Sequence, residues 1–267
     1  DLRMSRGLGD VYKRQVLLLC LLVMAVSIYH ICTYWQQEQA SLQLNDDLMN
    51  KATKSTDTQV ADEESDTPKE AFPQETPKEV APIVVDFEEL WKENGDVVGW
   101  LYCPDTVINY PIVQGDDNDY YLRRLLDGSN NIAGTLFIDV RNKGDFSDWN
   151  TVVYGHNMHN GTMFGTLTEY NSQEYYNAHP VMYLLTPLQN YKIEFIAGYV
   201  TSVDSEIYDI KNTIEERDTI VQMALDKTGF TSEVVITDND RIITLSTCSY
   251  EYENARYVLL GVLREIK

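Results

Sequence analysis

Positive charge is scarce in this chain. Its 267 residues include 21 lysines and arginines against 42 aspartates and glutamates, which gives a formal net charge of −21 at pH 7. A nucleic-acid-binding protein needs a basic surface to neutralise phosphates. The charge balance therefore argues against nucleic acid as a partner, although it says little about the fold.

Cysteine and histidine are also scarce, with four of each in the chain. Cys20 and Cys32 fall in an apolar run, so only Cys103 and Cys248 remain elsewhere. Two cysteines do not make the disulfide framework of a small secreted domain, and they form either one bridge or two free thiols. Cys103 lies between an apolar run and a proline, a setting typical of a small buried hydrophobic residue.

Residues 16–35 contain no Asp, Glu, Lys or Arg and form an apolar run of about 20 residues, long enough to span a bilayer. Lys13 and Arg14 precede the run and acidic residues follow it, so the positive-inside rule places the N-terminus in the cytoplasm and the rest outside. A cleaved signal peptide is the alternative. No clean Ala-x-Ala site is present, and the run continues past Ala25 and Ser27. We predict an uncleaved, single-pass membrane anchor.

Two polar segments flank this run. Residues 1–15 form the expected cytoplasmic leader, but Met4 is the only nearby methionine, so we expect part of this leader to be non-native. Residues 36–85 are acidic, hold few aromatics, and repeat Thr-Pro-Lys-Glu at residues 67–70 and 76–79. That composition predicts a disordered acidic stalk.

Residues 86–267 have the composition of one globular domain. The domain contains about eight short strand patterns and few helices, without the regular alternation of a parallel α/β sheet. The predicted fold class is therefore mainly β with peripheral helices. We expect a closed antiparallel barrel, because closure removes exposed sheet edges.

The expected elements follow from hydrophobic period and capping signals. The expected strands are 97–101, 107–113, 134–140, 151–155, 181–186, 191–201, 233–237 and two closing strands, 241–248 and 256–263. The expected helices are 87–94, 117–126, 163–170, 173–179 and 213–228. In the last of these, Thr213 and Glu216 have the spacing of a capping box.

The two closing strands carry the most distinctive chemistry. Cys248 ends the run 241–248, and Arg256 begins the run 256–263 after a segment of loop length. If the strands pair antiparallel, the thiol and the guanidinium lie side by side at the sheet rim. A thiol beside a fixed positive charge is a candidate nucleophile.

Such a nucleophile needs a base, and four histidines are available. His30 lies in the apolar run, His179 lies at a helix end, and His159 lies in a turn signature. His156 ends a strand after a glycine, so its side chain can project over the barrel mouth where Cys248 also ends a strand. His156 is the best candidate, and a purely structural histidine is the alternative.

These residues resemble the signature of the sortase family: Thr244-Leu-Ser-Thr-Cys248, Tyr154-Gly-His-Asn157 and the downstream Arg256. Four further motifs point to class B, namely Asn109-Tyr-Pro-Ile-Val-Gln114, Asp117-Asn-Asp-Tyr-Tyr-Leu122, Gly134-Thr-Leu-Phe-Ile-Asp139 and Asn160-Gly-Thr-Met-Phe-Gly165. The resemblance covers residues 87–267. It implies a closed eight-stranded β-barrel with an N-terminal helix and one long helix before the last strands.

The resemblance implies a membrane-anchored cysteine transpeptidase on the outside of a Gram-positive cell. Cys248 is then the nucleophile, His156 the acid and base, and Arg256 the group that holds charge on the scissile carbonyl. The substrate class is a C-terminal sorting signal of the LPxTG or NPxTx kind, cut between Thr and Gly, with a peptidoglycan amine as acceptor. Pilus assembly, hydrolytic release to water and a non-catalytic surface binding module are the alternatives.

The resemblance also implies substrate contacts. The matching positions are Asn118 and Leu122 for the first residues of the signal, Tyr154, Ser246 and Thr247 beside the reactive centre, and Tyr208 in the loop before the long helix. Core packing is the alternative for Leu122 and Tyr154, and a helix start for Asn118. No cofactor or metal is implied. A calcium site is the alternative for Asp116, Asp117 and Asp119, and a solvated helix start is preferred.

Overall fold

The structure is a computed structural model that describes residues 2–56 and 79–266. Its helices are α1 (Leu2–Ala52), α3 (Phe87–Glu93), α4 (Gln173–Ala178) and α5 (Ile214–Leu225), and its 3-10 helices are η1 (Tyr120–Arg123), η2 (Leu167–Asn171) and η3 (Glu206–Tyr208). Its strands are β1 (Thr53–Ser55), β2 (Ile83–Val85), β3 (Val97–Tyr102), β4 (Asn109–Val113), β5 (Leu136–Ile138), β6 (Asn150–Tyr154), β7 (Val181–Leu185), β8 (Asn190–Ser202), β9 (Arg241–Cys248) and β10 (Ala255–Ile266).

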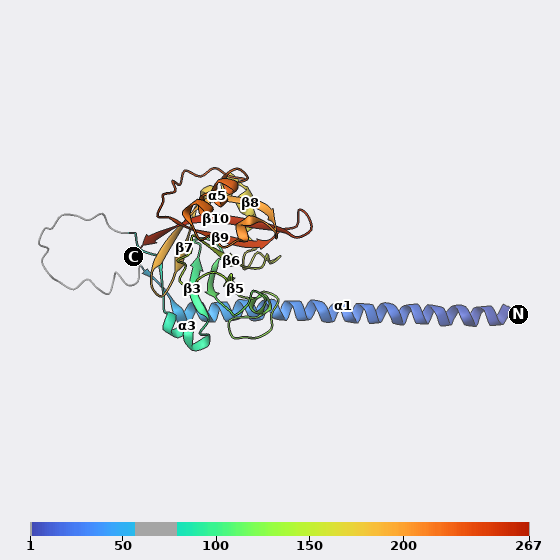
Figure 1. Ribbon diagram of the computed structural model, residues 1–267. Helices are drawn as coiled ribbons and strands as arrows, with labels where there is room; N and C mark the ends of the chain where they lie inside the picture. Colours follow the sequence, from blue (N-terminus) through green and yellow to red (C-terminus); the bar gives the residue numbers. More distant parts are fainter. Residues whose placement is uncertain (1, 57–78, 267) are drawn as a thin grey trace, which may run out of the picture.

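Eight strands close into a barrel in the order β10-β8-β7-β3-β4-β5-β6-β9, which confirms the predicted fold class (Figure 1). The expectation of a wholly antiparallel barrel is wrong, because β4 pairs with β5 in parallel and β6 pairs with β9 in parallel. Parallel neighbours need a crossover of a dozen or more residues. Residues 114–135 and 155–240 supply these two crossovers.

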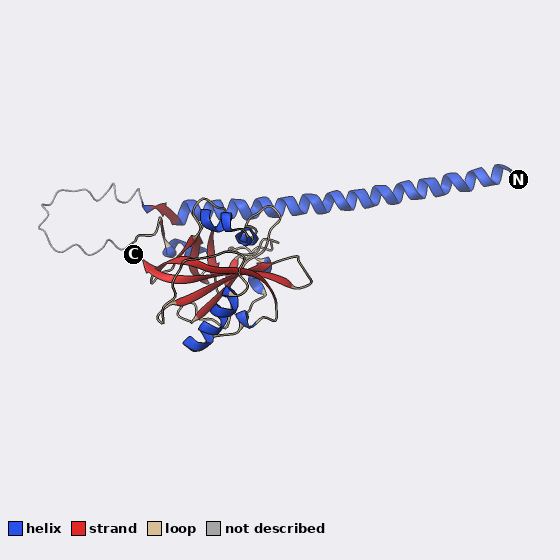
Figure 2. Ribbon diagram, turned by 90° about the horizontal axis from the view of Figure 1, so that it is seen from above, coloured by secondary structure: helices blue, strands red, loops and turns tan. Residues whose placement is uncertain are grey.

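Helices cover opposite sides of the barrel. Figures 1 and 2 show α1 along one side and α5 on the other. The predicted capping box of α5 is confirmed, since the Thr213 side chain accepts from the Glu216 amide and the Glu216 side chain accepts from the Thr213 amide. Ile220 and Ala224 of α5 are buried in one apolar cluster with β8 and β10.

The predicted disorder of residues 36–85 is wrong for the described part of that segment. Residues 36–52 continue α1 without a break, and β1 pairs antiparallel with β2. Leu48 and Ala52, spaced as one helical face, are only 4% and 3% exposed against the domain. The acidic average composition of residues 36–85 gives no indication of this apolar face of the helix. Residues 57–78, which carry the repeated tetrapeptide, lie outside the described residues.

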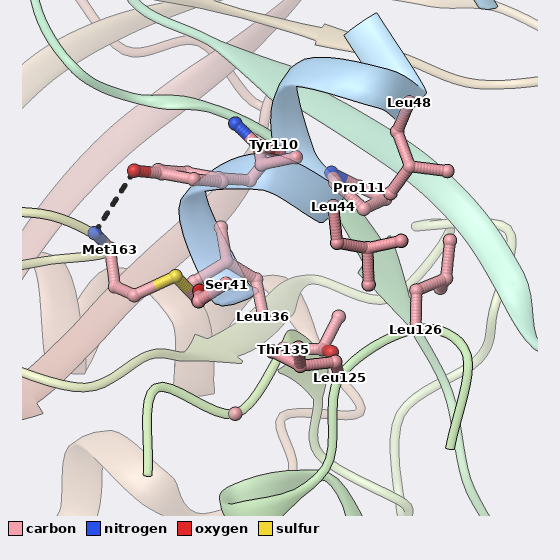
Figure 3. Close-up of a pocket in the computed structure, with 12 residues that line it drawn as sticks. Ser41, Leu44, Leu48, Tyr110, Pro111, Leu125, Leu126, Thr135, Leu136 and Met163 are labelled. Carbon is pink, nitrogen blue, oxygen red and sulfur yellow. Dashed lines mark hydrogen bonds between the residues drawn. The ribbon is translucent and has the colours of Figure 1, made fainter. Parts of the chain in front are cut away.

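The contact between α1 and the barrel is close-packed. Figure 3 shows Leu44 and Leu48 of α1 facing Pro111 and Leu136. The cavity that remains between them has a volume of about 30 Å³. That volume suits about one water molecule. This seam therefore joins α1 to the barrel and is too small to bind a substrate.

Three predicted elements differ in the structure. Residues 117–126 and 163–170 hold only the short 3-10 helices η1 and η2. The Asp117 carboxylate accepts from two following amides, an Asx turn that competes with an α-helix. Residues 233–237 form no strand, because Arg264 and Arg217 donate to the carbonyls of Val235 and Thr237.

Candidate active site

Strands β9 and β10 bring Cys248 and Arg256 together. The two strands pair antiparallel with Arg256 directly opposite Cys248, so the predicted pairing is confirmed. Both side chains are partly exposed, in contrast to the buried residues that flank them on their strands. The thiol and the guanidinium therefore share one rim of the barrel.

The parallel pairing of β6 and β9 adds His156. Tyr154 is the register partner of Ser246, and His156 and Cys248 each follow two residues later. The Gly155 amide donates to the Ser246 carbonyl at 3.1 Å, and the Thr247 hydroxyl donates to the Gly155 carbonyl at 2.8 Å. These bonds carry the pairing up to the rim. The sequence separation of 92 residues between His156 and Cys248 is thus bridged by two adjacent strands.

One cavity of about 340 Å³ lies at this rim. All nine residues predicted for the site line it, namely Asn118, Leu122, Tyr154, His156, Tyr208, Ser246, Thr247, Cys248 and Arg256. Substrate pockets are concave and apolar with a few convergent polar groups. This cavity has that character, because Leu122, Phe137 and Val203 stand beside the polar residues.

His156 is oriented by a bond to the backbone. Its Nε2 lies 2.6 Å from the carbonyl oxygen of Leu122. A carbonyl can only accept, so Nε2 must carry the hydrogen, and this partner assigns the tautomer. Nδ1 of the neutral ring is then the nitrogen that can exchange a proton. The contact also ties His156 to the segment that carries Leu122.

The other polar contacts at the rim fix backbone and leave the guanidinium accessible. The Asn157 side chain donates to the Cys248 carbonyl at 2.8 Å. Arg256 donates from Nη1 to the Ala255 carbonyl at 2.9 Å. Within residues 2–56 and 79–266, Arg256 makes no ion pair with a carboxylate. Its charge therefore remains available to a bound anion.

A buried carboxylate anchors the opposite wall of the cavity. Asp139 is fully buried, and it accepts two bonds from the Arg141 guanidinium and one from the Tyr154 hydroxyl at 2.9 Å. Burial opposes ionisation of Asp139, but these bonds and the positive charge outweigh it and lower the pKa to about 2. Burial and the Asp139 carboxylate raise the pKa of the Tyr154 hydroxyl. Asp139 therefore holds the Tyr154 ring in place.

Tyr208 joins this wall to β9. Its ring stacks on Tyr154 with centroids 6.1 Å apart, and its hydroxyl lies 2.9 Å from the Ser246 hydroxyl. Arg141 donates to the Tyr208 carbonyl at 2.9 Å. Burial raises the pKa of the Tyr208 hydroxyl to about 12. The loop before α5 is thus fastened to the cavity by one arginine and one hydroxyl pair.

Asn118 and Leu122 enter from the segment between β4 and β5. The Asn118 side-chain oxygen accepts from the Val140 amide at 2.8 Å, which fixes this residue beside the cavity. Leu122 is partly exposed in η1. Leu122 and Tyr154 are also partly buried beside an apolar core cluster, so they pack and line the cavity at once.

The remaining candidates lie elsewhere. His159 is exposed, and His179 is the C-cap of α4. Cys103 is a free, fully buried thiol whose pKa is raised by burial, as expected for a small core residue. Within the described ranges, no group of three or more His, Cys, Asp or Glu is arranged to hold a metal.

Sequence reasoning missed five residues that line the cavity: Phe137, Asp139, Arg141, Gly155 and Val203. Phe137 and Asp139 lie in the motif Gly134–Asp139 and Gly155 lies in the motif Tyr154–Asn157, but neither motif predicts a role for them. A buried Asp followed two residues later by Arg is a pattern that a search for paired charges can detect. Val203 offers no such signal.

The comparisons with known proteins agree with this geometry. The family model described as Sortase domain matches residues 101–264. The chain belongs to the sortase family. This sortase is 41% identical over 183 residues to sortase B of Listeria monocytogenes, covering 67% of this chain and 74% of that protein. It is 33% identical over 185 residues to sortase B of Staphylococcus aureus, covering 68% and 75%.

Solved structures place the sortase in the same class. The S. aureus sortase B–substrate complex matches with a TM-score of 0.64 and 30% identity, covering 68% of this chain and 85% of that one. A Bacillus anthracis protein described as similar to sortase B matches with a TM-score of 0.66 and 29% identity, covering 88% and 98%. The protein is thus a class B sortase, a cysteine transpeptidase whose family sorts proteins to the cell wall.

Proposed function

We propose that this sortase cleaves a C-terminal sorting signal between Thr and Gly and transfers the acyl group to a peptidoglycan amine. One observation carries the proposal: three neighbouring strands, β6, β9 and β10, bring His156, Cys248 and Arg256 to one cavity. The family supplies the substrate class.

In the first half-reaction, the Cys248 thiolate attacks the carbonyl carbon of the scissile Thr, and a C–S bond forms. Negative charge moves to the carbonyl oxygen, where the Arg256 guanidinium stabilises it. The C–N bond then breaks, and protonated His156 gives a proton to the leaving amine. A thioester with Cys248 remains.

In the second half-reaction, an acceptor amine attacks the thioester carbon. His156 takes the proton that the amine loses, the C–S bond breaks, and the thiolate leaves with an amide as product. The histidine returns to its protonated form, so the proton count closes over the cycle. Because the Leu122 carbonyl occupies Nε2, Nδ1 is the position from which the proton moves.

The walls of the cavity select the signal. Asn118 and Leu122 receive its first residues, whereas Tyr154, Ser246 and Thr247 surround the scissile bond. Tyr208 closes the side nearest α5 through its contact with Ser246.

The membrane arrangement forms part of the proposal. Helix α1 is long and apolar enough to cross a membrane, judged by its length and composition. We assign residues 16–35 to the bilayer, residues 1–15 to the cytoplasm, and the catalytic domain of residues 86–267 to the outside. Residues 36–52 then connect the two as helix.

Peptide cleavage tests the proposal directly. We expect the full chain in detergent to cleave a Thr-Gly signal peptide, and Cys248→Ala to abolish cleavage and thioester formation. Cys32→Ala is the matched control, because that cysteine lies in α1 and does not line the cavity. Product analysis with added triglycine should show transfer to the amine. Full activity of Cys248→Ala, or only hydrolysed product at every amine concentration, would contradict the assignment.

A further inference from the structure

The rim that holds the active site is tied to α1 just beyond its apolar run. The Asn131 side chain donates to the Gln37 carbonyl at 2.6 Å, and the Gln37 side chain accepts from the Ile132 amide at 3.1 Å. One residue further along α1, Glu38 accepts a bond from the Asn160 side chain. Two loops of the catalytic domain thus bond to positions of α1 that follow Trp35, the end of the apolar run, by two and three residues.

The β9–β10 loop belongs to the same edge. His159, next to Asn160, stacks on Tyr250 with ring centroids 6.2 Å apart and planes at 13°. Tyr250 follows Cys248 by two residues, and His159 follows His156 by three. The edge of the barrel that carries the catalytic residues is therefore the edge that meets the end of the apolar run.

Two views show this orientation. In Figures 1 and 2, the hairpin of β9 and β10 points in the direction that α1 takes toward its N-terminus, and the C-terminus lies at the opposite end of the barrel. The helix is unbroken from Leu2 to Ala52, and Leu48 and Ala52 are buried against the domain. A continuous, docked helix fixes how the domain is turned relative to the membrane.

We propose that the aromatic rim, defined as His159, Tyr250 and Tyr252, faces the bilayer and lies in its outer headgroup layer. This inference rests on the anchor assignment made above. Tyr250 and Tyr252 are 69% and 50% exposed, although their rings are large and amphipathic. Tyr and Trp are enriched at the membrane–water interface, because one end of the ring is apolar and the other polar.

Neighbouring residues limit the depth of this contact. Tyr34 and Trp35 are exposed at the end of the apolar run and mark the interface from the side of α1. Glu251 and Glu253 lie between and beside the rim tyrosines, and both are exposed. Two carboxylates are costly in hydrocarbon and tolerated among headgroups. The aromatic rim therefore rests at the surface and does not insert further.

This placement has a consequence for the reaction. The cavity with Cys248 opens beside the aromatic rim, so it lies at the height of the headgroups. A substrate protein that is still attached to the membrane can therefore reach the Cys248 thiol without leaving the membrane surface. The geometry favours reaction at the membrane over reaction deep in the cell wall.

Site-directed spin labelling tests the orientation. The full chain is reconstituted into phosphatidylcholine vesicles with Cys20→Ala, Cys32→Ala and Cys248→Ala, leaving only the buried Cys103 as a native thiol. A label is introduced through Tyr250→Cys or, as the matched control, through Leu188→Cys. Leu188 is 84% exposed in the β7–β8 turn, where Gln189 bonds the Ile266 carbonyl near the C-terminus.

We expect a headgroup-chelated paramagnetic ion to broaden the label at position 250 at least fivefold more than the label at position 188. Equal broadening at both positions, or loss of the chain from the vesicles on flotation, would overturn the proposal. Loss on flotation would also contradict the proposed membrane anchor, whereas equal broadening would contradict only the proposed orientation of the domain. Peptide cleavage by the chain with native Cys248 is measured separately, so failure of the proposed reaction is recognised by itself.

Discussion

At the scale of single residues, Arg256 carries the sharpest expectation. Its guanidinium lies opposite Cys248 and makes no carboxylate pair in the described part of the chain. Loss of one preorganised donor to an oxyanion costs about 100-fold in rate. We expect Arg256→Ala to lower kcat/KM for the signal peptide by about that factor. The decrease should appear in kcat, with little change in KM.

Arg241→Ala is the matched control, because Arg241 occupies the other end of β9 and pairs with Glu265 at 3.4 Å. Its kcat/KM should stay within about twofold of the parent. Equal losses in both variants would mean that Arg256 supports the hairpin and does not stabilise the oxyanion.

Asp139 gives a prediction about stability and pH. Its folded-state pKa of about 2 lies below the unfolded value of about 3.9. A depressed carboxylate pKa stabilises the fold at pH values above the unfolded pKa. We expect Asp139→Asn to lower the free energy of unfolding by about 2 kcal/mol at pH 7. Because the parent loses this contribution as the pH falls from about 5 toward 2, the difference between the two should shrink over that range.

Denaturant unfolding at several pH values measures this difference. Asp119→Asn is the control, because Asp119 is exposed and makes no side-chain ion pair among the described residues. Asp119→Asn should leave the free energy of unfolding unchanged at each pH. A constant difference between Asp139→Asn and the parent down to pH 2 would show that shape, and not charge, accounts for the loss.

At the scale of elements, α1 is part of the folded domain. Leu48 packs into an apolar cluster with Leu90, Trp100 and Val113. Replacing a buried leucine by alanine removes its transfer free energy and leaves a cavity. We expect Leu48→Ala to lower the free energy of unfolding by about 2 to 4 kcal/mol. Leu42→Ala, at an exposed position of the same helix, should cost less than about 0.5 kcal/mol. Similar effects of the two changes would mean that α1 does not dock as described.

Local signals predicted most elements well. Strand β9, strand β10 and the capped helix α5 follow from period and capping alone, and the Cys248–Arg256 pairing follows from loop length. The motifs of the family then located the cavity. Each of these features depends on contacts within a short stretch of chain, which a single sequence records.

Non-local contacts account for what was missed. The parallel pairing of β6 with β9 joins residues about 90 positions apart, and no local pattern encodes it. Residues 233–237 have a strand pattern, but arginines from α5 and β10 occupy their carbonyls. The helix of residues 36–52 was hidden because its apolar face is narrow and its average composition is acidic. In each case a tertiary partner decided the outcome.

At the scale of the whole molecule, one helix carries the apolar run, packs on the barrel and bonds to the active-site rim. Residues 1–15 hold four basic and two acidic residues and residues 16–35 hold none, so residues 36–267 have a formal net charge of −23. On the proposed topology, this acidic charge opposes insertion of the domain beyond the headgroup layer, because carboxylates are costly in hydrocarbon.

The sidedness of this arrangement can be measured in intact cells. In a chain that also carries Cys20→Ala, Cys32→Ala and Cys248→Ala, we expect a membrane-impermeant maleimide to label Leu188→Cys without permeabilisation, because the proposed topology places Lys13 and Arg14 inside and the catalytic domain outside. Tyr12→Cys is the matched control, since Tyr12 is exposed and lies before the apolar run. Its labelling should require permeabilisation. Labelling of Tyr12→Cys alone in intact cells would place the catalytic domain on the cytoplasmic side and remove the surface role, because the peptidoglycan acceptor lies outside.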